Sequence, residues 1–195
     1  MLNRSREFDY DYFVLISGEC LPLKHKLKLN DFLTLNNKSF IEINRLPEYD
    51  WRINTYNFFR DQCFVRWSLF KIINFPISRV QRFLPRRGNF TSSEIRMGSS
   101  WFVLKRKHVD FIISKSTDSY QKKFKYTTCS DEHYFQMLLK EQDDVITRNL
   151  HYIRFSNGNS SPDYLSEDDI YNVTTDVNCY FVRKVSENIM NIFKN

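Results

Sequence analysis

The sequence predicts an α/β domain, because short apolar runs typical of buried strands alternate with segments of helical periodicity. The first apolar run is residues 12–17, which a glycine closes. Residues 101–104 form a second run, and residues 107–114 after it carry apolar side chains at helical spacing. The chain ends on the same pattern, with a short strand predicted at 179–182 and a helix at 186–194.

The composition fits one globular domain with its own hydrophobic core. The chain has 195 residues, of which 42% are hydrophobic, and this length supports one core more readily than two. Only 4 residues are glycine, and neither G-x-G-x-x-G nor G-x-x-x-x-G-K-[ST] occurs. A glycine-rich phosphate loop is therefore excluded. The four cysteines are widely separated, without the spacing of metal ligands.

The charge favours anionic partners without identifying them. The formal net charge is +6, which attracts nucleotide diphosphates, nucleic acids or anionic membrane surfaces alike. Nucleic acid is not expected as a partner, because neither a concentrated basic stripe nor a known binding motif accompanies the charge. No apolar run reaches the roughly 18 residues that a membrane-spanning helix needs.

The first half of the chain predicts fewer elements than the second. Residues 27–36 are predicted to form a short helix after polar residues, and residues 40–43 a strand. Residues 51–69 are rich in aromatic side chains at spacings that fit a helix or a strand, so no element is assigned there. Prolines and an R-R-G string predict a loop over 74–94.

The second half begins with a helix predicted from Ser130. A hydroxyl residue, the acids Asp131 and Glu132, and then an apolar face are typical of a helix start. Residues 149–155 alternate like a strand and end at the turn signal N-G. Residues 166–169, S-E-D-D, predict the start of another helix.

Six segments carry a resemblance to a known family. The strongest four are D-Y-F-V-L-I-S-G-E-C-L-P-L-K at 11–24, G-S-S-W-F at 98–102, S-D-E-H-Y-F-Q at 130–136 and F-V-R-K-V at 181–185. N-L-H-Y-I at 149–153 and F-I-E-I-N-R-L-P at 40–47 are weaker. In this order and spacing they resemble the core-2/I-branching β-1,6-N-acetylglucosaminyltransferases and their peptide-O-xylosyltransferase relatives. The resemblance covers essentially the whole chain.

This resemblance implies a GT-A-like fold and a glycosyltransferase activity. Family members are inverting enzymes that move a sugar, here most simply N-acetylglucosamine, from a UDP-sugar donor to a hydroxyl of a glycan acceptor. They need no cofactor and no divalent metal, because basic side chains take the place of the metal at the UDP diphosphate. The sequence agrees in having no D-x-D triplet where a metal-bridging site would suit.

The resemblance assigns the catalytic base to Glu132. In the first turn of the predicted helix, the positive end of the helix dipole favours its carboxylate form, which accepts a proton. The alternative is that Asp131 and Glu132 are solvated residues that only complement the dipole.

Arg183 and Lys184 match the stretch that binds the diphosphate of the donor. Neighbouring side chains on a strand point in opposite directions, so we expect at most one of the two to face the phosphates unless the chain bends there, and Lys184 is the better match. The alternative is an ordinary surface dipeptide. For a second cation from upstream, Arg154 is a poor substitute.

The remaining candidate residues are assigned with less specific roles. Gly98 and Ser99 would let the backbone approach the donor. Trp101 would contact a sugar, although the core is the commoner place for such a side chain. Glu42 would accept hydrogen bonds from acceptor hydroxyls. His133 and His151 are further candidates for a catalytic role, although a histidine beside aromatic residues more commonly has a structural role.

The sequence departs from the family in two places. Where the family has an acid after its S-G pair, Cys20 stands here, with Glu19 just before it. The family's first, uridine-binding half has no counterpart before the strand at 12–17, so we expect one glycosyltransferase domain, residues 1–195, that lacks this half. The free edge of that strand would then be liable to association with another chain.

Two hypotheses on function and two on location stay open. The chain is expected to be an active UDP-sugar-dependent transferase, or alternatively an inactive truncated fragment that acts as a binding or structural piece. A bacterial-type member is expected in the cytoplasm, peripheral to the membrane, and a eukaryotic member in the Golgi lumen.

Overall fold

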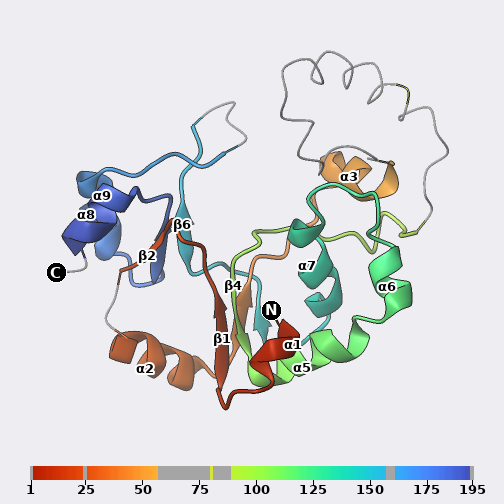
Figure 1. The fold of residues 1–195 in the computed structure, drawn as a ribbon, viewed down its shortest axis with the longest axis horizontal. Helices are drawn as coiled ribbons and strands as arrows, with labels where there is room; N and C mark the ends of the chain where they lie inside the picture. Colours follow the sequence, from red (N-terminus) through yellow and green to blue (C-terminus); the bar gives the residue numbers. More distant parts are fainter. Residues whose placement is uncertain (1, 24–25, 57–79, 81–88, 157–160, 194–195) are drawn as a thin grey trace. The chain divides into compact units, whose positions relative to one another are not determined.

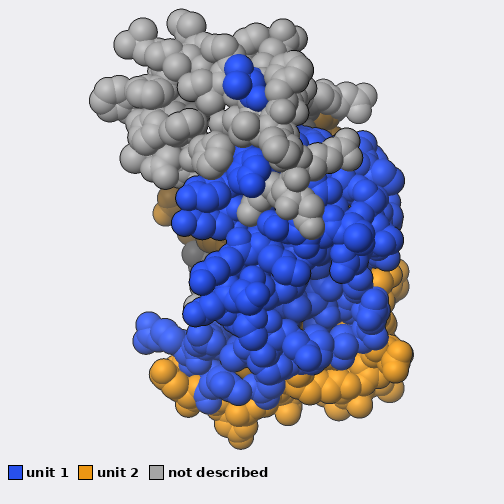
Figure 2. Space-filling view, turned by 90° about the vertical axis from the view of Figure 1, so that its right-hand side faces the viewer, with its two compact units in different colours: residues 1–6, 43–100, 110–142 blue, residues 7–42, 101–109, 143–195 orange. Residues whose placement is uncertain are grey.

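The computed structural model describes residues 2–23, 26–56, 80, 89–156 and 161–193. The chain divides into two compact units, which are coloured separately in Figure 2. Unit 1 comprises residues 1–6, 43–100 and 110–142, and unit 2 comprises residues 7–42, 101–109 and 143–195. Much of the loop predicted at 74–94, most of the unassigned stretch 51–69 and the turn predicted after residue 156 lie outside the described residues.

Strands and helices alternate along the chain, which confirms the α/β class (Figure 1). The strands are β1 Tyr12–Leu15, β2 Cys20–Pro22, β3 Ser39–Ile41, β4 Phe102–Lys105, β5 Val145–Ile146, β6 His151–Ile153 and β7 Phe181–Arg183. The helices are α1 Leu2–Ser5, α2 Lys26–Asn36, α3 Trp51–Asn54, α5 Arg106–Lys115, α6 Asp118–Lys122, α7 Tyr134–Leu139, α8 Glu167–Thr174 and α9 Glu187–Phe193, with 3₁₀ turns η1 Pro47–Tyr49 and η3 Ser130–Glu132.

The first sheet of unit 2 has the strand order β1-β4-β3-β5. β4 pairs antiparallel with β1 and β3, and β5 runs parallel to β3. β3 is fully buried, whereas every residue of β1 is only partly buried. The predicted strand at 12–17 is therefore present but shorter, and the expectation that it is buried is wrong, because β1 lies at the edge of its sheet and pairs on one side.

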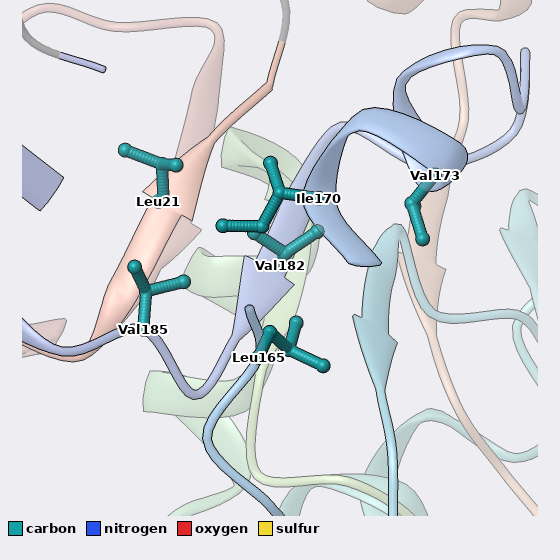
Figure 3. Close-up of a cluster of buried hydrophobic side chains, with 6 residues drawn as sticks. All are labelled: Leu21, Leu165, Ile170, Val173, Val182 and Val185. Atoms are coloured by element: carbon teal, nitrogen blue, oxygen red, sulfur yellow. The ribbon is translucent and has the colours of Figure 1, made fainter. Parts of the chain in front are cut away.

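The second sheet of unit 2 has the order β2-β7-β6, with β7 antiparallel to β2 and parallel to β6. Ser166 caps α8 through a reciprocal capping box with Asp169, as the S-E-D-D string predicts. Side chains from both of these regions gather in one buried cluster (Figure 3), which consists of Leu21, Leu165, Ile170, Val173, Val182 and Val185. Burying each such side chain stabilises the fold by roughly 1.5–3 kcal/mol, so this core fixes β7 and the residues that follow it.

Unit 1 is built around an aromatic core. Its buried members are Ile53, Phe90, Ile95, Phe124 and Met137, and the rings of Tyr120 and Tyr134 pack against them. Tyr120 stacks edge-on against Tyr134, with ring centroids 5.1 Å apart. Because α3 and α7 both contribute to this core, it holds the segment between residues 130 and 139 in place.

The helix predicted from Ser130 is corrected by the structure. Residues 130–132 form the separate turn η3, which has no side-chain cap, and the α-helix α7 begins only at Tyr134. Cys129 has a left-handed backbone with φ of 51°, and His133 between the two elements has φ of −123°. The backbone leaves the helical path at His133 because that side chain turns into the protein, where it is fully buried.

Candidate active site

Glu132 is held by an arginine within unit 1. Its Oε2 lies 2.5 Å from Nη1 of Arg52 on α3. The guanidinium of Arg52 also lies over the ring of Tyr49, 4.6 Å from its centroid. The side chains of Arg52 and Glu132 are 19% and 33% exposed. A guanidinium at this distance favours the ionised carboxylate and restricts its position, so Glu132 presents a partly exposed, oriented anion.

The two predicted motifs at 98–102 and 130–136 contact each other through the backbone of Glu132 and its neighbours. Gly98 N donates to the carbonyl of Glu132 at 2.9 Å, and Gln136 Nε2 donates to the carbonyl of Ser99 at 2.9 Å. Ser100 Oγ donates to Asp131 Oδ2 at 2.6 Å. The 98–100 segment therefore fixes the backbone on which Glu132 stands, which is the role of Gly98 and Ser99 that the structure makes visible.

The α-helix dipole argument for Glu132 is wrong. η3 is a single 3₁₀ turn, and α7 starts two residues after Glu132, so the carboxylate is not in the first turn of an α-helix. The positive charge beside the carboxylate comes instead from the guanidinium of Arg52. Arg52 lies in the stretch 51–69, for which no element was predicted, and it was therefore not among the predicted site residues.

His133 has a structural position beside the candidate base. Its Nδ1 lies 2.9 Å from the carbonyl of Arg96, and the side chain is fully buried. Burial lowers the pKa of His133, which leaves a neutral ring that donates from Nδ1. Its Nε2 has no partner among the described residues.

In unit 2, the two predicted cations converge on one carboxylate. Arg183 Nη2 and Lys184 Nζ lie 3.3 Å and 3.6 Å from the same atom, Oε2 of Glu19. Arg183 and Lys184 face one common partner because β7 ends at Arg183, so the alternation of a strand, on which the expectation of a single phosphate-facing side chain depends, does not extend to Lys184. The two side chains are 14% and 18% exposed.

Other groups hold the two cations in place. Arg183 Nη1 donates to Ser17 Oγ, and its guanidinium lies 4.8 Å from the ring centroid of Trp101. Lys184 Nζ lies over the ring of Tyr164 at 5.4 Å. Arg183 is thus fixed by three different contacts, counting Glu19 with Ser17 and Trp101.

Glu19 joins two of the predicted motifs. Cys20 pairs with Arg183 in the β2–β7 ladder, and Val185 N donates to the carbonyl of Glu19 at 3.0 Å. Tyr164 Oη donates to Glu19 Oε1 at 2.8 Å. This hydrogen bond first, and the charges of Lys184 and Arg183 after it, lower the pKa of Glu19.

Glu19 was not among the predicted site residues, although one signal pointed to it. It stands next to Cys20, which occupies the place of the family's acid, and Cys20 is buried. The carboxylate beside the two cations therefore comes from the preceding residue.

A family model described as core-2/I-branching enzyme matches residues 3–177. The chain belongs to the core-2/I-branching enzyme family. A search of curated proteins found no match. The matched residues include Glu132, the 98–102 motif and Glu19, whereas Arg183 and Lys184 lie beyond the end of the match.

Trp101 of this core-2/I-branching enzyme is only partly buried. Its ring lies 6.4 Å from that of His151, which in turn stacks on Phe181 at 4.7 Å. His151 Nδ1 lies 2.9 Å from Asn149 Oδ1. Burial, with the charge of Arg183 as a second cause, lowers the pKa of His151 to about 4. His151 is therefore a neutral ring that packs against Phe181 and lies near Trp101, the aromatic side chain that contacts Arg183.

Glu42 and Arg154 are placed away from any role that the structure makes visible. Glu42 follows β3 in unit 2 and is partly buried. Arg154 Nη1 pairs with Asp169, and its Nε lies 3.7 Å from Asp163. Two carboxylates thus neutralise Arg154, which agrees with the expectation that it is a poor second cation.

The part of the chain that the structure describes contains neither a metal-binding cluster nor a membrane-spanning helix. Within these residues, no group of three or more His, Cys, Asp or Glu side chains is arranged to hold a metal ion. Asp9 and Asp11 form a D-x-D string ahead of β1, and Asp9 pairs with Arg106 at 2.9 Å. None of the helices described has both the length and the apolar character required to span a bilayer.

Proposed function

We propose that this core-2/I-branching enzyme is a GT-A-type, inverting glycosyltransferase that uses a UDP-sugar and no divalent metal. N-acetylglucosamine is the proposed sugar, and a hydroxyl of a glycan is the proposed acceptor. Membership of the family supplies the glycosyltransferase class. The observation that supports the finer assignment is the convergence of Arg183 and Lys184 on a single carboxylate oxygen.

Two cations aimed at one oxygen suit a diphosphate. A carboxylate oxygen and a phosphate oxygen are both anionic acceptors, so Glu19 indicates where a phosphate oxygen would be bound. Arginine offers a planar fork of donors and lysine a compact charge, and both are common phosphate ligands. In the proposed reaction they stabilise the negative charge that grows on the departing diphosphate.

Glu132 is the proposed general base. The acceptor hydroxyl transfers its proton to the Glu132 carboxylate as its oxygen attacks the anomeric carbon of the donor. The bond between that carbon and the diphosphate oxygen breaks in the same displacement, and UDP leaves with the bonding electrons. Attack opposite the leaving group inverts the anomeric carbon. The contact with Arg52 holds the Glu132 carboxylate in position before the reaction.

The proposal is tested by calorimetric titration of UDP into the full chain, with and without EDTA. Binding is expected to survive EDTA, to weaken about tenfold in Lys184→Ala through loss of a charge-assisted contact, and to persist in Glu132→Gln. Lys28→Ala, an exposed lysine on α2, is the matched control. Failure of the folded wild type to bind UDP would refute the proposed donor.

A transfer assay separates the enzyme from the alternative of an inactive binding piece. UDP-N-acetylglucosamine and a mixture of glycan acceptors are incubated with wild type and Glu132→Gln. Product that depends on Glu132 supports the transferase. Donor binding without product in either protein would favour the binding piece.

A further inference from the structure

Glu19 pairs with Arg183 and Lys184, the two cations that the proposed function assigns to the diphosphate of the donor. We propose that Glu19 is an internal anion that competes with the diphosphate of the donor for Arg183 and Lys184. The inference rests on the proposed function in taking UDP as the ligand. It adds that the affinity for UDP is set by the displacement of a carboxylate belonging to the protein itself.

The contacts of Glu19 are those expected of a bound anion. Oε2 lies 3.3 Å from Arg183 Nη2 and 3.6 Å from Lys184 Nζ, and Oε1 accepts a hydrogen bond from Tyr164 Oη at 2.8 Å. Three donors, two from the adjacent residues Arg183 and Lys184 and one from Tyr164, therefore converge on one carboxylate. A ligand that needs the same two cations must replace these contacts.

One carboxylate leaves the two cations with an excess of one positive charge. A diphosphate carries more negative charge than a carboxylate, so it gains more from the same pair of cations. Displacement of Glu19 by a diphosphate is therefore favourable, but it costs the energy of the existing ion pairs.

The side chain of Glu19 has room to move away from Arg183 without releasing the other contacts of Arg183. The side chain of Glu19 is 37% exposed and lines a pocket of about 490 Å³ with Gly18, Tyr164, Val185, Ser186, Glu187 and Met190. Pockets of this size hold small ligands. Ser17 and Trp101 continue to hold Arg183 when Glu19 swings away. The alternative is that Glu19 is needed to position the cations, and the two ideas predict opposite effects of its removal.

The test compares Glu19→Gln with wild type in calorimetric titrations of UDP and of inorganic pyrophosphate. Glutamine keeps the size of the side chain and one acceptor oxygen, which can still accept from Tyr164 Oη, but it removes the charge and the second acceptor. We expect Glu19→Gln to bind both probes roughly two- to fivefold more tightly, the size of a partly exposed ion pair. Glu187→Gln, at a residue that lines the same pocket, is expected to change affinity less than about twofold by the same measure of exposed charge. Glu19→Gln with Lys184→Ala is expected to lose the gain.

Each outcome decides the inference. Equal or weaker binding of both probes by a folded Glu19→Gln variant, or binding of neither probe by either protein, overturns it. If UDP binds through Lys184 but Glu19→Gln binds no more tightly, the inference fails and the proposed donor stands. If Glu19→Gln gains affinity for pyrophosphate while neither protein binds UDP, the competition stands and the proposed donor fails.

Discussion

The two units each contain a glutamate paired with arginine, and the pairs differ in the charge that they leave over. In unit 1, Arg52 Nη1 lies 2.5 Å from Glu132 Oε2. In unit 2, Glu19 meets both Arg183 and Lys184. The pair of Arg52 and Glu132 has no net charge, and the Glu132 carboxylate is partly exposed, as a proton acceptor must be. The arrangement in unit 2 keeps a net positive charge, which suits an anion. The same two residue types therefore support opposite chemical roles, depending on the ratio of cations to carboxylates.

The largest expected effect separates the two glutamates by activity. Glu132→Gln removes the proposed base, so the rate of sugar transfer is expected to fall about 10²- to 10⁴-fold, with UDP affinity unchanged. Glu19→Gln leaves the base intact and is not expected to lower the rate at saturating donor. Initial rates of transfer from UDP-N-acetylglucosamine measure both. A similar loss in the two variants would contradict the division of roles.

The second prediction uses pH to single out unit 2. The pKa of His151 is lowered from 6.5 to about 4, so between these values the unfolded chain binds a proton that the folded chain does not. Stability is then full above pH 6.5 and is lost as pH falls toward 4, by about 2–3 kcal/mol from this group. Urea unfolding of wild type and His151→Phe across this range measures the difference.

The other histidines do not obscure this comparison. His108 and His133 also have pKa values lowered by burial, but both remain in the variant, so the difference between the two curves isolates His151. Parallel curves for wild type and His151→Phe would show that His151 does not titrate in this way.

The third prediction compares the two arginines by stability. Arg183 is 14% exposed and has an ion pair, a hydroxyl partner and an aromatic partner. Arg183→Ala is expected to lower the free energy of unfolding by about 2 kcal/mol, the scale of a charged hydrogen bond in a partly buried site. Arg52→Ala, which loses one ion pair and the face of Tyr49, is expected to cost about 1 kcal/mol. Denaturant titration of the two variants measures this order, and the reverse order would refute it.

The parts of the fold that the sequence predicts are those with a local cause. The run at 101–104 gives β4 and the apolar spacing after it gives α5, because each pattern is read within a few residues. Ser166 and Asp169 define the start of α8 in the same way. β2 and β5 were not predicted, since β2 contains a proline, polar residues flank β5, and both pair with strands that are distant in the sequence.

In the candidate site as well, the features with a local cause were predicted and those that depend on distant partners were not. The residue types at 98–102, 130–136 and 181–185 are visible in the sequence, but their partners are not. Arg52 reaches Glu132 across a long stretch of chain, and Glu19 reaches Lys184 only because β2 pairs with β7. Such pairings are set by tertiary structure, which explains why the sequence indicated the proposed base and the proposed diphosphate ligands and missed the residues that contact them.

The smallest expected effect concerns Trp101, which was predicted as a sugar contact and lies in the structure against Arg183. A cation over an aromatic face contributes about 0.5–1 kcal/mol at a partly exposed site. Trp101→Leu is therefore expected to weaken UDP binding about two- to fivefold, while Trp101→Phe, which keeps an aromatic face, preserves most of it. Calorimetry gives the UDP affinity, and transfer kinetics give the KM for the acceptor. A rise in acceptor KM in both variants, with UDP affinity unchanged, would instead assign Trp101 to the acceptor sugar and leave Arg183 held by Glu19 and Ser17 alone among the contacts described for it.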